Sequence, residues 1–131
     1  MRLRGVGVDV TDVRRISRLI ERRGSRFIHR WFTTEEVAEC GVSESPTVAF
    51  AVRFAAKEAV WKSIRIDWDG SVPWRSISIL GADAAPTVKL GDEVAAAARD
   101  LGVSAISIAV VVHEYRAMAV AICEEGRSIP T

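Results

Sequence analysis

The sequence has few cysteines and no long apolar run, and both absences narrow the classes of protein it can belong to. Its only two cysteines, Cys40 and Cys123, are far apart and form no CxxC pair, so neither a disulfide framework nor a zinc site is expected. No stretch approaches the ~20 apolar residues of a membrane span, and the N-terminus lacks the apolar core of a signal peptide. We therefore expect a cytoplasmic protein that does not bind membranes and whose two thiols are buried or free.

A strong net charge is also absent. The 18 basic and 17 acidic side chains leave a formal charge of +1, and 49% of the residues are hydrophobic against 27% charged, which is the balance of a globular protein. A length of 131 residues fits one domain. We expect a single domain over residues 1–125 and a flexible tail over residues 126–131.

Positive charge is nevertheless concentrated in one segment. Seven arginines lie between residues 14 and 30, and only Glu21 opposes them there. Such a segment can meet nucleic acid, a membrane surface or an acidic protein, or can be the solvated face of a helix. The near-neutral chain and the absence of a nucleic-acid-binding motif argue against nucleic acid.

The hydrophobic periodicity predicts an α+β fold, in which a long helix packs on a small antiparallel sheet. The long helix opens at Ser45-Pro46 and is apolar nearly all round, so it should be largely buried. Other helices are expected over 12–23, 27–32, 33–41 and 91–101, and strands over 3–10, 76–80, 87–90, 104–112 and 117–122.

Asp9 is the first candidate functional residue. It lies in the first strand, and the period of two places Gly5 and Gly7 on the same face. We expect these glycines to leave room for a ligand to approach Asp9. A role for Asp9 as a cap or an ion-pair partner is the alternative.

Glu58 is the second candidate, because it lies inside the long apolar helix, where an unpaired carboxylate is expensive. Lys62 follows four residues later on the same helix face, so an ordinary helical ion pair is one interpretation. In the other, Asp9 and Glu58 meet beside Lys62 and provide the oxygen ligands that Mg²⁺ takes together with water and substrate phosphate.

Four segments of the chain resemble one known family. They are residues 5–9 (GVGVD), 13–16 (VRRI), 32–36 (FTTEE) and 53–62 (RFAAKEAVWK). In order, spacing and overall chain length they resemble the holo-acyl-carrier-protein synthases, small 4′-phosphopantetheinyl transferases. The resemblance covers most of the chain and is densest in its first half.

The resemblance implies an activity and a set of catalytic residues. Asp9 and Glu58 would hold Mg²⁺ against the diphosphate of coenzyme A, Glu58 would assist deprotonation of a serine of the acyl carrier protein, and Lys62 would stabilise the phosphates. The serine would receive the 4′-phosphopantetheine arm, and adenosine 3′,5′-bisphosphate would leave. The carrier would belong to fatty-acid or polyketide synthesis.

The resemblance also implies binding residues and an assembly. Family members are typically trimers with active sites at subunit interfaces. Coenzyme A contacts are expected at Arg53, Lys57, Lys62 and His113. The carrier protein is expected to dock on Arg15, with Arg14, Arg22 and Arg26 extending the same surface.

Two departures from the family pattern leave alternatives open. The segment 64–69 (IRIDWD) replaces a Gly-x-Gly, and Val110 and Val112 replace small hydroxylated residues ahead of His113. We expect both valines to point to one face of their strand and to weaken coenzyme A binding. The chain is then either an active enzyme with altered contacts or an impaired relative that binds carrier protein; a nucleic-acid-binding domain is a third reading.

Overall fold

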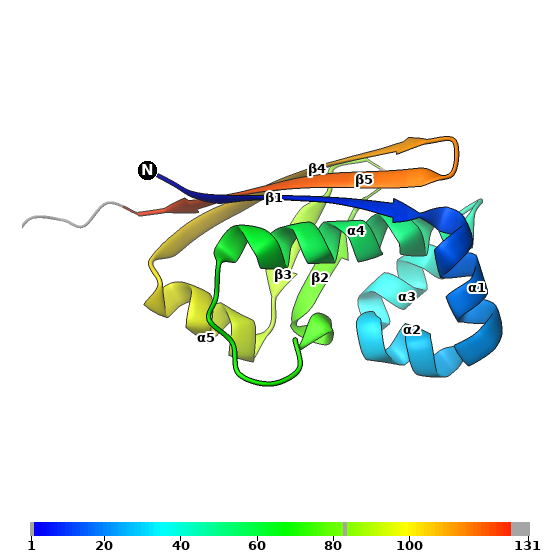
Figure 1. Cartoon of the computed structure of the whole chain (residues 1–131), viewed down its shortest axis with the longest axis horizontal. Helices are drawn as coiled ribbons and strands as arrows, with labels where there is room; N and C mark the ends of the chain where they lie inside the picture. Colours follow the sequence, from blue (N-terminus) through cyan, green and yellow to red (C-terminus); the bar gives the residue numbers. More distant parts are fainter. Residues whose placement is uncertain (1, 83, 127–131) are drawn as a thin grey trace, which may run out of the picture.

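The apolar segment that follows Ser45 forms the central helix α4 (Pro46–Ile64). Pro46 stands at the first turn, where a missing N–H leaves no hydrogen bond unmade. Ala55, Ala56 and Ala59 are fully buried, and these small side chains let neighbouring elements approach the helix closely. The computed structural model describes residues 2–82 and 84–126, and α4 runs through the middle of that region (Figure 1).

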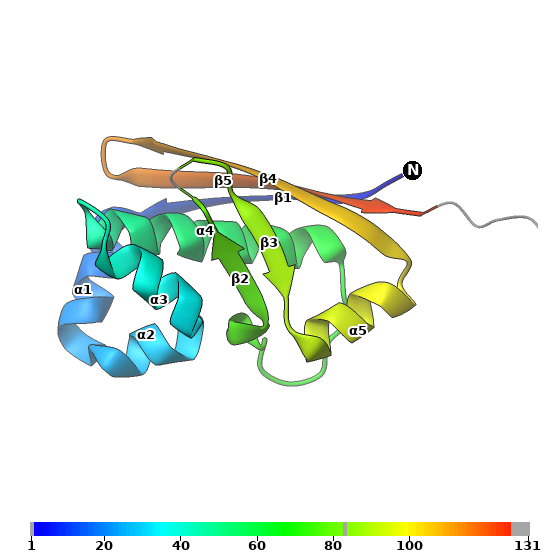
Figure 2. The same cartoon turned by 180° about the vertical axis from the view of Figure 1, so that it is seen from behind.

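A three-stranded antiparallel sheet covers one side of α4. Its order is β1 (Arg2–Asp12), β5 (Arg116–Glu125) and β4 (Val103–His113). A second, two-stranded sheet of β2 (Ile77–Leu80) and β3 (Thr87–Leu90) crosses α4 on another side (Figure 2). The α+β prediction, with a long helix on a small antiparallel sheet, is confirmed.

The shorter helices gather at the two ends of α4. At one end lie α1 (Val13–Arg23), α2 (Ser25–Trp31) and α3 (Thr34–Gly41), and at the other lies α5 (Asp92–Asp100) (Figure 1). The one-turn helix η1 (Trp74–Ser76) leads into β2. The hydrophobic core has two parts: one joins α4 to the sheets and α5, and the other joins it to the three N-terminal helices.

The ends of α1 and α3 carry the capping signals visible in the sequence. The Asp12 carboxylate accepts the N–H of Arg14 at 2.8 Å, and Gly24, with φ of 53°, ends α1. Thr33 and Glu36 form a reciprocal capping box at the start of α3. The predicted boundaries of α1 and α3 are confirmed. They could be predicted because capping depends on residues adjacent in sequence.

The glycines beside Asp9 serve helix packing, and our expectation that they leave room for a ligand is wrong. A Cβ atom at Gly7 would overlap the backbone carbonyl of Ala59, and one at Gly5 would overlap that of Ser63. The space beside β1 is therefore filled by α4. The opposite face of β1 carries valines that are more than half exposed, namely Val6, Val8 and Val10.

Other expectations concern the thiols, the tail and membranes. Cys40 and Cys123 are both buried, and neither is in a disulfide. Within residues 2–82 and 84–126, no helix combines the length and apolar character needed to cross a membrane. Residues 127–131 of the expected flexible tail lie outside the described residues.

We predict that Gly7→Ala lowers the free energy of unfolding by about 1–3 kcal/mol or more, because the added methyl group pushes β1 away from α4. Gly41→Ala is the matched control, since a Cβ at Gly41 meets no atom within 4 Å and should leave stability unchanged or slightly higher. Urea unfolding of both variants measures the difference. Equal stability of the two variants would contradict the close strand–helix packing.

Candidate active site

Asp9, Glu58 and Lys62 come together where β1 lies against α4. The Lys62 ammonium lies 3.3 Å from Asp9 Oδ1 and donates to the carbonyl of Val8 at 3.2 Å. The Asp9 side chain is 13% exposed and that of Lys62 is 54% exposed, so the group is open to solvent on the lysine side. Lys62 thus joins strand to helix, which favours the interpretation that the two acids meet beside it.

The Glu58 carboxyl group is affected by both burial and Asp9. Partial burial, followed by a hydrogen bond with Asp9 and the charge of Asp9, raises its pKa to about 7, while Lys62 and Arg15 oppose the rise. Two adjacent carboxylates that cannot both ionise freely retain a proton unless a cation compensates them. The pair therefore has the electrostatics of a cation site.

The donor set suits magnesium better than zinc. The described residues contain no group of three or more His, Cys, Asp or Glu side chains placed to hold a metal, whereas a protein zinc site needs three or four such ligands. Mg²⁺ is commonly bound by one or two carboxylates, with water and substrate phosphates as the remaining ligands. Asp9 and Glu58 fit that pattern.

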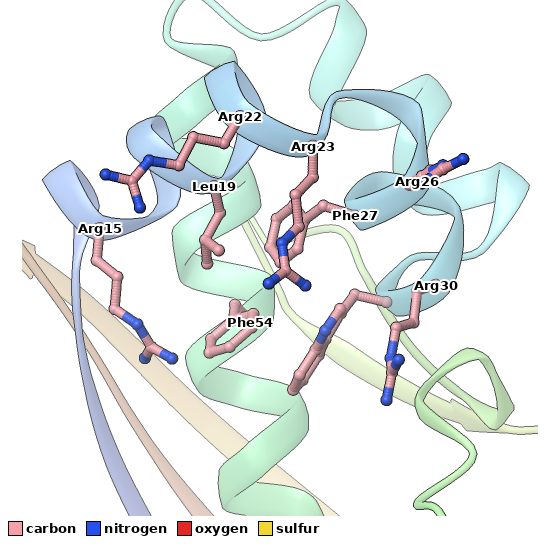
Figure 3. Close-up of a pocket in the computed structure, with 9 residues that line it drawn as sticks. Arg15, Leu19, Arg22, Arg23, Arg26, Phe27, Arg30 and Phe54 are labelled. Atoms are coloured by element: carbon pink, nitrogen blue, oxygen red, sulfur yellow. The ribbon is translucent and has the colours of Figure 1, made fainter.

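A basic cleft of about 850 Å³ lies between α1, α2 and α4 (Figure 3). Aromatic and aliphatic side chains form its floor, and arginines form its rim. Arg23 reaches toward Phe54, whereas Arg26 points outward (Figure 3). The lining residues are Arg15, Leu19, Arg22, Arg23, Arg26, Phe27, Arg30, Trp31 and Phe54.

Three of the four predicted docking arginines line this cleft, namely Arg15, Arg22 and Arg26. Arg14 does not, because its guanidinium pairs with Asp12 at 2.7 Å and lies 3.7 Å from the centre of the Tyr115 ring. The hydrogen bond from Arg14 lowers the pKa of Asp12 to about 2.

Arg23 and Arg30 also line the cleft, although neither is among the predicted docking residues. Both belong to the arginine segment 14–30, and this was the signal in the sequence that could have indicated their place in the cleft.

Arg15 connects the basic cleft to the carboxylate pair. Its guanidinium carbon lies 5.6 Å from the centre of the Phe54 ring, and its charge lowers the pKa of Glu58. Phe54 and Glu58 are one helical turn apart on α4, so they share a face. A partner bound in the cleft would therefore lie beside the carboxylates.

Lys57 is enclosed in the protein interior. Its side chain is fully buried, pairs with Glu36 at 2.6 Å and donates to the carbonyl groups of Trp74 and Ile77. Burial lowers the pKa of Lys57, and Glu36 opposes that change. The ammonium ties α4 to α3, η1 and β2 and reaches no surface, so its position does not support the predicted contact with coenzyme A.

Arg53 is enclosed in the same way one turn earlier on α4. Its side chain is 2% exposed, pairs with Glu39 at 2.5 Å and donates to the carbonyl of Ala49 at 3.1 Å. A guanidinium held inside the chain is not available to a phosphate. The structure thus gives Arg53 a role in packing α3 against α4, and its position does not support the predicted contact with coenzyme A, which stays a prediction.

His113 lies apart from the carboxylate pair. It ends β4, its side chain is 74% exposed, and its register partner is Arg116 on β5. Because β5 separates β4 from β1, His113 does not lie next to Asp9 of the same chain. The two valines ahead of it lie on one face of β4, as expected: their register partners Ala119 and Ala117 are both buried, and both valines line one small pocket against α4.

The segment 64–69, where the resemblance leads us to expect a Gly-x-Gly, is held by aromatic contacts. The Trp68 ring meets the Trp61 ring edge-on at 5.7 Å, and its N–H donates to the carbonyl of Ser71 at 3.1 Å. Trp61 also meets Trp74, which stacks on Trp31 at 4.3 Å. All four tryptophans of the chain therefore form one connected series that begins at the basic cleft.

Comparison with known proteins identifies the family. A model described as "4′-phosphopantetheinyl transferase superfamily" matches residues 5–123. A holo-acyl-carrier-protein synthase of Methylobacterium radiotolerans is 40% identical over 66% of this chain and 64% of that relative. One of Moorella thermoacetica is 37% identical over 93% of this chain and 94% of that relative.

The fold comparison agrees with the sequence match. The crystal structure of the holo-acyl-carrier-protein synthase from Neisseria meningitidis superimposes with a TM-score of 0.85 at 31% identity, covering 94% of this chain and 99% of the other. The chain belongs to the 4′-phosphopantetheinyl transferase superfamily. The prediction of a transferase of the holo-acyl-carrier-protein synthase family is confirmed.

The pKa of Glu58 predicts how stability depends on pH in metal-free protein. Its folded-state pKa of about 7 exceeds the ordinary value of 4.5. The folded state therefore binds more protons between these values, and the free energy of unfolding falls as pH rises through this window. Glu58→Gln stays neutral and should lose this dependence. At about pH 8 it should be more stable than wild type by about 1–2 kcal/mol, allowing for solvent screening.

Urea unfolding in the presence of a chelator, repeated at several pH values, measures this difference. Glu44→Gln, at an exposed position, controls for the loss of one negative charge. A Glu58→Gln variant whose stability follows the wild-type pH profile would show that Glu58 ionises without hindrance.

Proposed function

We propose that this transferase moves the 4′-phosphopantetheine arm of coenzyme A to a serine of an apo acyl carrier protein, with Mg²⁺ held by Asp9 and Glu58. The main support is the meeting of Asp9, Glu58 and Lys62 at the edge of β1, beside a basic cleft. Two carboxylates and one ammonium provide ligands for a cation and a partner for a phosphate oxygen.

In the proposed mechanism each side chain acts on a stated atom. Lys62, which is exposed and flexible, binds a phosphate oxygen of the diphosphate. Glu58 accepts the proton of the serine hydroxyl, directly or through water, as a general base. The serine oxygen bonds to the β-phosphorus, the bond to the bridging oxygen breaks, and adenosine 3′,5′-bisphosphate leaves. The metal, when bound, neutralises developing charge on the diphosphate.

The carrier protein docks in the basic cleft in this proposal, and it belongs to fatty-acid or polyketide synthesis. The arginine rim favours an acidic partner and speeds its association. The floor of Leu19, Phe27 and Phe54 offers apolar contact to the same partner. Arg15 lies between this cleft and Glu58, so a serine at the end of a docked helix would reach the carboxylates.

We further propose that the active unit is a homotrimer. Support comes from the outer face of the three-stranded sheet, where Val6, Val8, Val10, Val111, Val120 and Ile122 are 39–55% exposed. A large apolar patch of this kind marks an interface. In such an assembly a neighbouring copy would supply His113 to coenzyme A. Sedimentation that shows only monomers at micromolar concentration would contradict this assembly.

The first prediction on activity is that incubation with coenzyme A, Mg²⁺ and an apo carrier protein adds one phosphopantetheine to the carrier, read by intact mass. Asp9→Asn and Glu58→Gln should each reduce the rate by about 100-fold or more, because each removes an ionised oxygen from a site with two protein carboxylates. The variants should remain folded.

An unchanged carrier mass with the wild-type protein would favour the alternative of an impaired relative that only binds carrier protein. Lys89→Met, which removes an exposed ammonium paired with Glu35 on another part of the surface, is the control and should retain full activity. Near-wild-type turnover by Asp9→Asn would show that the metal assignment is wrong.

A second prediction concerns the cleft. Arg22→Glu should raise KM for the carrier protein with little change in kcat at saturation, and it should weaken the salt dependence of KM, because this arginine contacts the partner and not the reacting atoms. Arg99→Glu on α5 is the matched charge reversal away from the cleft and should leave KM unchanged. A collapsed kcat with unchanged KM for Arg22→Glu would refute docking at this surface.

A further inference from the structure

Thr11 is a buried polar residue that directly contacts Asp9. It follows Asp9 by two positions on β1, so both side chains point to the same face of the strand. Its relative exposure is 2%, and its hydroxyl donates to Asp9 Oδ2 at 3.0 Å. The other oxygen, Oδ1, lies 3.3 Å from the Lys62 ammonium. Each oxygen of the Asp9 carboxylate therefore has its own donor.

The two donors differ in how firmly they are held. Lys62 has a long side chain that is 54% exposed, so it can turn from Asp9 to a phosphate. Thr11 is β-branched, which restricts its first side-chain torsion, and it is buried on the face of β1 that packs against α4. When substrate draws Lys62 aside, the Thr11 hydroxyl is the contact that continues to hold Asp9.

The Thr11 hydroxyl is not needed to build the strand. Its register partner on β5 is Ala117, which is fully buried, so the position lies in an apolar layer. Valine has the same branched shape and an equal preference for strands. A hydroxyl at this position must be hydrogen-bonded, and its partner is the one carboxylate of β1 that belongs to the site.

We propose that Thr11 is a positioning residue that fixes the Asp9 carboxylate in the orientation in which it holds the divalent metal. This inference rests on the proposed role of Asp9 as a metal ligand. A carboxylate oxygen has more than one acceptor site, so the Thr11 hydrogen bond orients Oδ2 and leaves acceptor capacity for a cation. Contacts behind a ligand commonly determine metal affinity in this way.

The test measures metal binding without turnover. Mn²⁺ is titrated into wild type and Thr11→Val in the presence of coenzyme A and without carrier protein, and free Mn²⁺ is followed by electron paramagnetic resonance. Thr11→Val should bind Mn²⁺ about 10- to 100-fold more weakly, and Thr11→Ser, which keeps the hydroxyl, should bind it nearly as wild type does. In turnover assays Thr11→Val should need more Mg²⁺ for half-maximal rate and recover most of kcat at saturation.

Thr87→Val is the matched control, since Thr87 is an exposed strand threonine whose hydroxyl donates to the Leu80 carbonyl, and this variant should bind Mn²⁺ as wild type does. If urea unfolding shows Thr11→Val to be destabilised, the comparison of Thr11→Ser with Thr11→Ala replaces it, because both lack the methyl group and differ only in the hydroxyl. Equal Mn²⁺ affinity of Thr11→Ser and Thr11→Ala would overturn the inference about Thr11 but not the proposed metal site. Wild-type protein that binds no Mn²⁺ in the presence of coenzyme A would overturn both the inference about Thr11 and the proposed metal site.

Discussion

The close packing of β1 against α4 is the constraint on which the site depends. Gly5 and Gly7 let the strand backbone approach the carbonyls of Ser63 and Ala59, and this approach places Asp9 beside Glu58 and Lys62. A side chain at either glycine would separate strand and helix by the width of a methyl group or more. The two carboxylates come from elements far apart in sequence, so only this contact unites them.

The charged side chains of α4 fall into two groups that face different parts of the fold. Arg53 and Lys57 turn inward and pair with Glu39 and Glu36 on α3, while Glu58 and Lys62 turn toward β1. The Lys57–Glu36 pair is fully buried, and removing one partner of such a pair leaves an uncompensated charge, which typically costs about 3–5 kcal/mol. The inward pairs therefore fix α3 and β2 on α4, and the outward residues are left for chemistry.

Local signals predicted the elements of the fold from sequence. Asp12 and Thr33 cap the helices that follow them, and Pro46 begins α4; all three act on neighbours in the chain. The meeting of Asp9 with Glu58 was indicated by a family resemblance, since spacing alone does not say which helix covers a strand. For the same reason the strand period placed Gly7 on the face of Asp9 but did not reveal that α4 fills the space beside it.

The inward position of Lys57 was also missed, although a signal existed. Glu36 and Glu39 are three residues apart on α3, and Arg53 and Lys57 are four apart on α4. Such spacings place each pair on one helix face, so two acids can meet two bases when the helices pack side by side. That pattern becomes informative only once α3 is known to lie against α4.

The connected tryptophans give the protein an optical property that follows from its packing. Trp31 lines the basic cleft, Trp74 stacks on it, and Trp61 links Trp74 to Trp68 in the loop after α4. Since each ring contacts the next one in space, excitation of any one can pass to the others. The tryptophan emission of this chain thus originates from a single region, which touches both the cleft and the loop after α4.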